Sequence, residues 1–191
     1  MVKRLGERFL GLPPALAADI QVGDGRVLLA ATRARYDIVI VDAHASEVYI
    51  PFDLATRQFF ALVRRHLRPG GIVALNVNAL SPHSLLLRSI VRTLRTVFPY
   101  TYVAKVGGEF NYLVCGSLAP VDARVLTLPG RVSPALRPLA RRVAAGWRAD
   151  AGSGGWLLTD NRAPVDYLTN REILHRAERL GYLGGGATHS A

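Results

Sequence analysis

The feature that most constrains the fold is an apolar run closed at each end by an acid. Residues 37–42 read Asp-Ile-Val-Ile-Val-Asp, so four β-branched side chains stand in a row without a polar one between them. A strand that faces solvent on one side alternates apolar and polar residues, whereas a strand covered on both faces is continuously apolar. The run therefore predicts a buried strand in a sheet with helices on both faces, which is an α/β arrangement.

Helical and strand patterns alternate along the chain, and Gly and Pro separate them. The first half of the pattern predicts an opening helix from Val2, a strand at 20–22, a turn at 23–25, a helix at 26–35 and the strand at 37–42. A helix at 53–67, a strand at 72–77 and a helix after Pro82 follow. The last part predicts strands at 100–106 and 110–117, a linker at 118–131, and helices at 133–147 and 168–180. Strands that alternate with helices and finish on an antiparallel pair predict a mostly parallel sheet that ends in an antiparallel hairpin.

The chain has 191 residues, half of them hydrophobic, which is enough for one compact domain with its own core. We expect this domain to span residues 1–182. Residues 183–191 read Leu-Gly-Gly-Gly-Ala-Thr-His-Ser-Ala, so little can be buried there and a disordered tail is expected.

Composition excludes some classes of protein. The net charge is +10, but the arginines are spread along helical stretches without interleaved aromatic residues, which disfavours nucleic-acid binding. Cys115 is the only cysteine, so no intramolecular disulfide forms, and its apolar surroundings predict a buried thiol. No apolar run reaches about 18 residues, so we expect no membrane segment. The first residues do not resemble a secretory signal, so a cytoplasmic location is expected.

Two acids follow predicted strands, at the sheet edge where α/β proteins bind ligands. Asp24 stands between Gly23 and Gly25. Its carboxylate can accept a hydrogen bond from an exocyclic amine such as that of adenine, and Gly25 lets the backbone approach a flat ring. Taken alone, this Gly-Asp-Gly favours a simple turn over the ligand role. Asp42 ends the surest strand, which places it at the ligand crevice, although a helix cap or a loop acid is the alternative.

The loop at 43–51 adds Glu47 and Tyr49 to the surroundings of Asp42. Paired acids suit a cationic amine, because they stabilise its charge and one of them can accept a proton. His44 has no second histidine or cysteine beside it and is interpreted as a loop hydrogen bonder. The sequence contains no metal-ligand spacing.

Several of these stretches resemble a known family. Residues 36–43, the loop through Glu47, the helix at 55–60 and the Leu-Arg-Pro-Gly-Gly at 67–71 are similar to spermidine synthases, which are polyamine aminopropyltransferases. The closest likeness is to their divergent bacterial branch, which has a late motif similar to Thr-Asp-Asn-Arg-Ala-Pro-Val at 159–165. Nucleotide-dependent methyltransferases share the Leu-x-Pro-Gly-Gly pattern. The resemblance implies the Rossmann-like class I S-adenosylmethionine-dependent methyltransferase fold.

The resemblance also implies an activity and its residues. An aminopropyl group would pass from decarboxylated S-adenosylmethionine to a diamine such as putrescine, in polyamine biosynthesis. Asp42 would orient the attacking amine and take its proton. The residues expected to bind the nucleotide are Asp24, Gly25, Asp42 and Ala43, and those expected to bind the amine are Glu47, Tyr49 and Asp160. The stretch around Asp160 is also interpretable as an N-cap and a turn.

The sequence departs from the family pattern in two places. Classical members carry another acid where Ala45 stands, so the identity of the amine is left open. In the family, a glycine-rich loop and the acid that ends the second strand precede the opening helix, and this sequence contains neither of them. We therefore expect a domain truncated at its N-terminus, impaired as an isolated chain, which forms a homo-oligomer or is completed by another chain at an exposed strand edge. The alternatives are an S-adenosylmethionine-dependent methyltransferase and a non-catalytic partner or degenerate domain.

Overall fold

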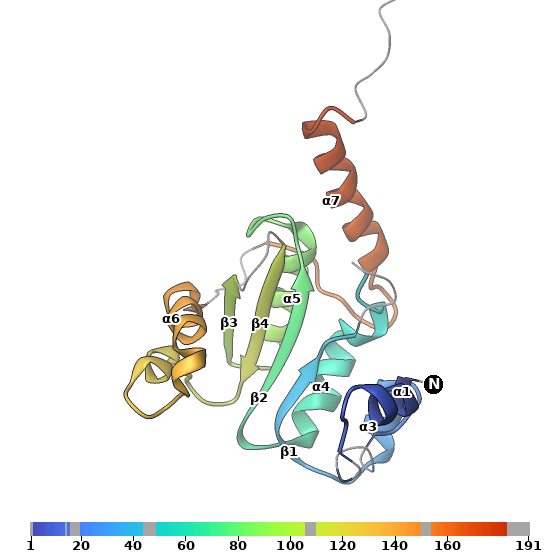
Figure 1. The fold of residues 1–191 in the computed structure, drawn as a ribbon. Coiled ribbons are helices and arrows are strands. Elements are labelled where there is room, and N and C mark those ends of the chain that lie inside the picture. The colour runs from blue at the N-terminus through green and yellow to red at the C-terminus, as the bar shows by residue number, and fades with distance from the viewer. Residues whose placement is uncertain are drawn as a thin grey trace, which may run out of the picture. The chain divides into compact units, whose positions relative to one another are not determined.

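The structure is a computed structural model that describes residues 2–13, 15, 20–43, 49–105, 110–149 and 154–182 (Figure 1). It divides into two compact units, residues 1–32 and 33–191, and each is described here by itself. Some expectations lie outside the described residues, namely those for His44, Ala45, Glu47 and the tail at 183–191. The single domain expected over residues 1–182 stays a prediction.

The first unit contains two short helices, α1 (Val2–Phe9) and α3 (Gly25–Ala31). The strand expected at 20–22 is wrong, because these residues lie outside the sheet and Val22 is 89% exposed. Three apolar residues without a paired neighbour gain neither ladder hydrogen bonds nor burial. The helix expected at 26–35 is found at Gly25–Ala31, and none of its residues is buried.

The second unit is built on a five-stranded sheet. In spatial order its strands are β1 (Tyr36–Val41), β2 (Leu67–Asn78), β4 (Asn111–Ser117), β3 (Tyr100–Lys105) and β5 (Arg148–Ala149). Only β1 and β2 pair in parallel, and the other three pairings are antiparallel. The α/β class and the closing hairpin are confirmed, but the sheet is mixed rather than mostly parallel. The reason is that β4 returns between β2 and β3, so those two strands point the same way without touching.

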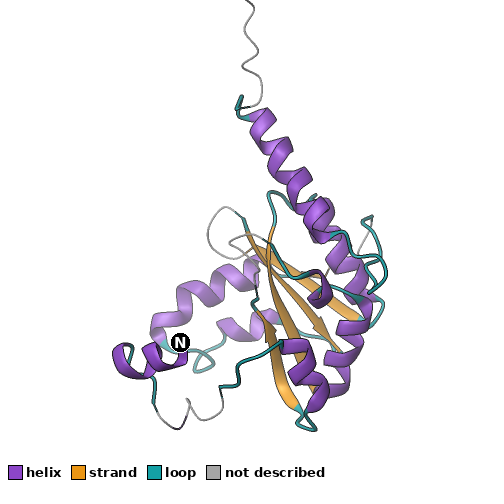
Figure 2. Ribbon diagram, turned by 90° about the vertical axis from the view of Figure 1, so that its right-hand side faces the viewer, coloured by secondary structure: helices purple, strands orange, loops and turns teal. Residues whose placement is uncertain are grey.

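Helices pack on both faces of this sheet (Figures 1 and 2). The helical elements are η1 (Phe52–Leu54), α4 (Arg57–His66), α5 (Leu85–Arg95), η2 (Ala123–Thr127), η3 (Pro134–Leu136), α6 (Arg137–Gly146) and α7 (Val165–Arg179). α4 and α5 cover one face, where Phe60, Val73 and Ile90 are fully buried. α6 contacts β3, and Trp147 just after it stacks on Tyr102 of the opposite face. No helix in the described ranges is long and apolar enough to cross a bilayer.

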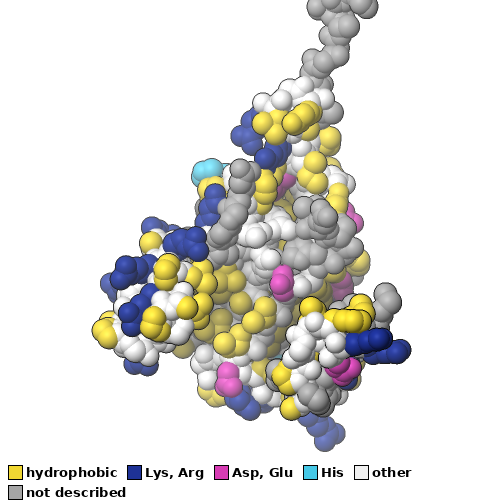
Figure 3. Space-filling model, viewed as in Figure 1, with side chains coloured by type: hydrophobic (Ala, Val, Ile, Leu, Met, Phe, Trp, Pro, Cys, Tyr) yellow, Lys and Arg dark blue, Asp and Glu magenta, His cyan; other side chains and the backbone are white. Residues whose placement is uncertain are grey.

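One face of β1 and β2 stays open in this unit. Along β2, Val73 and Leu75 are buried under the helices, whereas the alternate residues are partly exposed. On the edge strand β1, Ile38 is 58% and Ile40 is 72% exposed. Figure 3 shows apolar side chains gathered over the middle of the sheet on this side. The strand itself is confirmed, but its burial on both faces is wrong, because no described segment of the second unit covers β1 there.

Cys115 lies on β4 and is 3% exposed, as its apolar surroundings predict. Burial raises the pKa of its thiol to about 12. Because the thiolate is the reactive form, a thiol with this pKa is inert at neutral pH. The expectation of a buried thiol is confirmed.

Candidate functional site

The carboxyl ends of β1 and β2 place Asp42 at an exposed edge of the sheet. Val41 pairs with Leu75, so Asp42 and Asn76 each follow a paired residue on neighbouring strands. The Asn76 Nδ2 atom donates a hydrogen bond of 3.2 Å to Asp42 Oδ1. The carboxylate is exposed to solvent and held by a side chain of the adjacent strand. An amide in an otherwise apolar strand is the signal that the sequence analysis missed.

The loop after Asp42 returns to the fold at Tyr49. Ala43 is half-buried, and Ile50 is 2% exposed and anchors the end of the loop in the core. The Tyr49 hydroxyl donates a hydrogen bond to Asn170 Oδ1 on α7. Tyr49 is therefore positioned by α7, and its role toward an amine stays a prediction.

Asp160 lies at the N-terminus of α4. The Thr56 hydroxyl donates a 2.6 Å hydrogen bond to Asp160 Oδ1, and Thr56 is fully buried. The Thr56 Oγ1 atom also caps the helix by accepting a hydrogen bond from the Phe59 amide. The Arg57 amide donates to the Leu158 carbonyl at 2.9 Å. A carboxylate at a helix N-terminus is favoured by the helix dipole. The structure thus gives Asp160 a role in stabilising the N-terminus of α4, while its contact with an amine stays a prediction.

We expect Asp160→Ala to lower the free energy of unfolding by about 1–2 kcal/mol, because the buried Thr56 hydroxyl would lose its acceptor at 2.6 Å and keep only the Asp53 carbonyl at 3.5 Å. Urea unfolding followed by circular dichroism measures this change. The exposed neighbour Asn161 provides the control, and Asn161→Ala should change stability by less than about 0.5 kcal/mol. Equal stabilities for the two variants would contradict the structural role of Asp160.

A cavity of about 500 Å³ opens beyond the end of β2. Its wall is mostly apolar and is formed by Asn78, Ala79, Leu80, Leu86, Phe110, Asn111, Thr169, Glu172, Ile173 and Arg176. The Arg176 guanidinium lies 4.2 Å from the centre of the Phe110 ring, a cation–π contact between α7 and the start of β4. An apolar cavity with a few polar groups at the strand ends is typical of a small-molecule site.

Glu172 joins α7 to the N-terminus of α5. Its carboxylate accepts hydrogen bonds from the Leu80 amide at 3.1 Å, from the Leu86 amide at 3.4 Å and from the Ser84 hydroxyl. Burial, and secondarily the charge of Glu172, raise the pKa of Tyr112, so its hydroxyl stays protonated at neutral pH. Nothing in the sequence signals this role, because Glu172 is separated from Leu86 by 86 positions.

Asp24 belongs to the first unit, where it begins α3. Its Oδ1 atom accepts a 2.9 Å hydrogen bond from the Val27 amide, and Gly25 is the first helical residue. Asp24 is therefore the N-cap of α3. The second carboxylate oxygen is compatible with another donor, and contact with adenine stays a prediction. Within the described ranges, no group of three or more His, Cys, Asp or Glu residues is placed to hold a metal ion.

Solved structures define the class of fold. A probable spermidine synthase from Corynebacterium glutamicum has a TM-score of 0.60 and 23% identity, covering 82% of this chain and 59% of that one. Human methyltransferase-like protein 13, solved in complex with SAH, has a TM-score of 0.53 and 19% identity, covering 74% of this chain and 64% of that one. The chain has the Rossmann-like α/β fold of these two proteins.

Sequence comparisons define the family. The spermine/spermidine synthase domain matches residues 16–107. A probable polyamine aminopropyl transferase of Bifidobacterium longum is 32% identical over 173 residues, 79% of this chain and 38% of the relative. Putrescine N-methyltransferase 2 of Nicotiana attenuata is 30% identical over 132 residues, 62% of this chain and 35% of the relative. Residues 16–107 thus match the spermine/spermidine synthase domain, in agreement with the motifs, and the chain spans less than two fifths of the length of these relatives.

Proposed function

We propose that this chain takes part in aminopropyl transfer from decarboxylated S-adenosylmethionine to a diamine such as putrescine. The observation that carries the proposal is the carboxylate of Asp42, exposed at the end of β1 and oriented by Asn76. Polyamine biosynthesis is the function of the spermidine synthase family, whose domain matches residues 16–107, and this similarity supports the proposal. Because the chain spans 38% of its aminopropyl transferase relative, the activity of that whole protein enters here only as a proposal.

The reaction requires a group that accepts one proton from the amine. The amine nitrogen attacks the aminopropyl carbon bound to the sulfonium, a C–N bond forms, and the C–S bond breaks. The electron pair of that bond stays on sulfur, so methylthioadenosine leaves as a neutral thioether. The nitrogen then carries an extra proton, which passes to the Asp42 carboxylate. A carboxylate also stabilises the cationic diamine before reaction. Glu47, Tyr49 and Asp160 are proposed to contact that amine.

A second candidate is methylation of the amine by S-adenosylmethionine. The similarity to a putrescine N-methyltransferase and the fold shared with a methyltransferase solved with SAH favour it. The donor distinguishes the two reactions. Spermidine and methylthioadenosine are the products of aminopropyl transfer, whereas N-methylputrescine and SAH are those of methylation.

The test is a single-turnover assay with the chain in excess over labelled donor, so that slow transfer is detected. We expect labelled spermidine from decarboxylated S-adenosylmethionine and putrescine. Labelled N-methylputrescine from S-adenosylmethionine would favour the second candidate. If neither donor reacts and calorimetry shows no binding of methylthioadenosine, the chain is a non-catalytic member of its family and the proposal fails.

A substitution at Asp24 separates nucleotide binding from helix capping. Ser caps helices as well as Asp does, so Asp24→Ser should leave α3 intact while removing the charged acceptor. We expect methylthioadenosine binding, measured by calorimetry, to weaken by about 1–3 kcal/mol. The matched control is Asp37→Ser, which removes an exposed acid paired with Arg68. If Asp24→Ser binds methylthioadenosine with unchanged affinity, Asp24 serves only as the N-cap of α3.

A further inference from the structure

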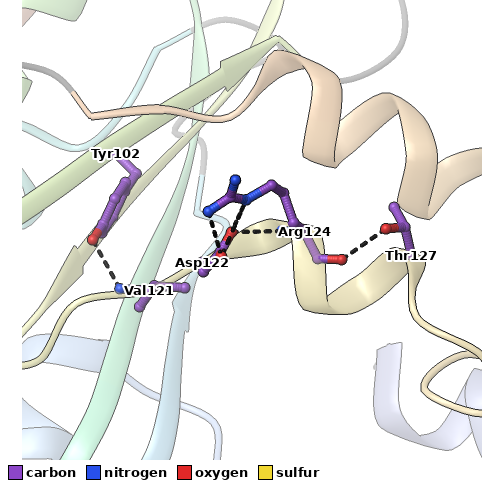
Figure 4. A network of polar contacts seen from close by, with 5 residues as sticks. All are labelled: Tyr102, Val121, Asp122, Arg124 and Thr127. Carbon is purple, nitrogen blue, oxygen red and sulfur yellow. Dashed lines mark hydrogen bonds and ion pairs between the residues drawn. The ribbon is translucent and has the colours of Figure 1, made fainter.

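The segment that contains η2, η3 and α6 packs against β3. η2 and α6 pack on each other, with Ala123 and Ala140 buried between the elements. Figure 4 shows how the segment is fixed: the Val121 amide donates a 2.8 Å hydrogen bond to the Tyr102 hydroxyl. The Tyr102 ring in turn stacks on Trp147 at 4.9 Å between ring centroids. The surface of this segment is therefore held in one arrangement.

That surface exposes large aliphatic side chains. Val125, Leu128, Leu136 and Leu139 are between 43% and 52% exposed. Single exposed aliphatic residues are ordinary, but four within 15 residues of a packed segment form a patch. We call residues 122–146 with these side chains the α6 surface. Apolar side chains of this kind gain free energy when a partner removes them from water.

The same surface is strongly basic. Residues 119–149 contain six arginines and one acid, Asp122. Asp122 is paired with Arg124 at 2.9 Å, and the hydrogen bonds from Arg124 lower the pKa of Asp122. The charges of these two residues therefore cancel. The remaining arginines include Arg131, Arg137, Arg141 and Arg142, all exposed. Figure 3 shows Lys and Arg side chains mixed with apolar ones over α6.

Two of these arginines border a hollow. A cavity of about 220 Å³ lies between the end of η2 and α6, and Arg137 and Arg141 line it together with Leu126, Thr127, Leu128, Pro129 and Val132. Because Arg137 and Arg141 are four residues apart, they lie on the same side of the helix. Paired guanidinium groups beside an apolar wall suit a phosphate attached to a hydrocarbon chain.

We propose that the α6 surface docks the protein onto a bilayer that contains anionic phospholipids. Aliphatic side chains enter the boundary between headgroups and acyl chains, while the arginines stay at the level of the phosphates. A nucleic-acid partner would use the charges but not the aliphatic residues, and the single aromatic residue of this stretch, Trp147, is already stacked on Tyr102. This inference is independent of the proposed transfer reaction.

Vesicle sedimentation with the full chain tests the proposal. The vesicles are phosphatidylcholine alone, or equal parts of phosphatidylcholine and phosphatidylglycerol. We expect binding only to the second kind. Arg137→Gln combined with Arg141→Gln should weaken this binding about 25-fold, because each cation near an anionic surface contributes about fivefold. The control combines Arg65→Gln with Arg95→Gln, two exposed residues on α4 and α5, and should weaken binding less than about twofold.

A second variant tests the apolar contribution. Leu136→Ser combined with Leu139→Ser keeps the charge and should weaken binding at least about tenfold, an effect that persists at high salt. Circular dichroism confirms that each variant is folded. Equal effects of the two arginine pairs, or equal binding to both kinds of vesicle, would overturn the proposal. Binding to single-stranded RNA without binding to the anionic vesicles would overturn the proposal in favour of a nucleic-acid partner. Loss of vesicle binding in millimolar inorganic phosphate would also overturn it, because the cavity beside Arg137 and Arg141 would then be a site for a free anion.

Discussion

Replacing Asp42 by Asn should lower the rate of aminopropyl transfer about 100-fold or more, the usual loss when a general base is removed. The amide keeps the shape of the side chain and can still hydrogen-bond Asn76, which now lies 3.2 Å from the carboxylate. It cannot accept the proton that the attacking nitrogen releases. The rate constant of the single-turnover reaction at saturating putrescine measures this loss directly.

Asp37 offers a matched control on the same strand. It lies at the opposite end of β1 and pairs with Arg68 at 2.6 Å, so Asp37→Asn removes the same charge far from the sheet edge that holds Asp42. We expect its transfer rate to stay within about twofold of the original, because exposed ion pairs contribute little. Asn76→Ala, which removes the hydrogen bond from Asn76 but keeps the Asp42 carboxylate, should fall between the two. An unchanged rate in Asp42→Asn would remove Asp42 from the mechanism.

Replacing Gly155 by Ala should cost about 3 kcal/mol of stability or more, a hundredfold change in the folding equilibrium. A Cβ atom there would lie 2.5 Å from the backbone of Arg88 and Ser89, inside α5. The backbone of a helix cannot yield without breaking its own hydrogen bonds. The segment after Gly155 is also fixed to α5, because the Trp156 amide donates to Ser89 Oγ at 2.8 Å.

The neighbouring Gly154 separates the effect of the steric clash from the effect of backbone conformation. Gly154 and Gly155 have nearly the same φ, +76° and +80°, so alanine pays a similar cost of left-handed backbone at both positions, about 1 kcal/mol. At Gly154, however, the nearest contacts of the new Cβ are all with the side chain of Arg88, the closest being Nη1 at 3.0 Å, and a side-chain end can shift more easily than helix backbone. Denaturant unfolding should therefore separate the variants by about 2 kcal/mol. Equal losses would show that backbone conformation alone is responsible.

The strands predicted well are those marked by a continuous apolar run. The strand at 37–42 is found at Tyr36–Val41, although its expected burial is wrong, and the strand at 72–77 lies in the second half of β2, because continuous apolar runs have few alternatives to a sheet. β5 was missed because it is two residues long and exists only through its pairing with β3. The mixed order of the sheet was missed because a hairpin pattern does not say on which side its second strand lies.

The site was predictable only where one strand determines it. Asp42 follows from the end of β1, and its place at the sheet edge is as expected. The contacts of Asp160 and Glu172 link positions that are 104 and 86 residues apart, so no local pattern encodes them. The family motif at 159–165 suggested a contact of Asp160 with the amine, which stays a prediction, and the described contact of Asp160 is with Thr56 at the start of α4. An acid in a motif thus carries a packing role that the residue type alone does not reveal.

The position of β4 also sets an order of events during synthesis. β4 lies between β2 and β3, both of which leave the ribosome before it. β1 and β2 can pair once residue 78 has been made, but β3 has neither of its neighbours β4 and β5 until later residues have been made. Until then the edge of β2 that β4 will cover is unpaired. Closure of the sheet therefore depends on the late synthesis of a single strand, β4.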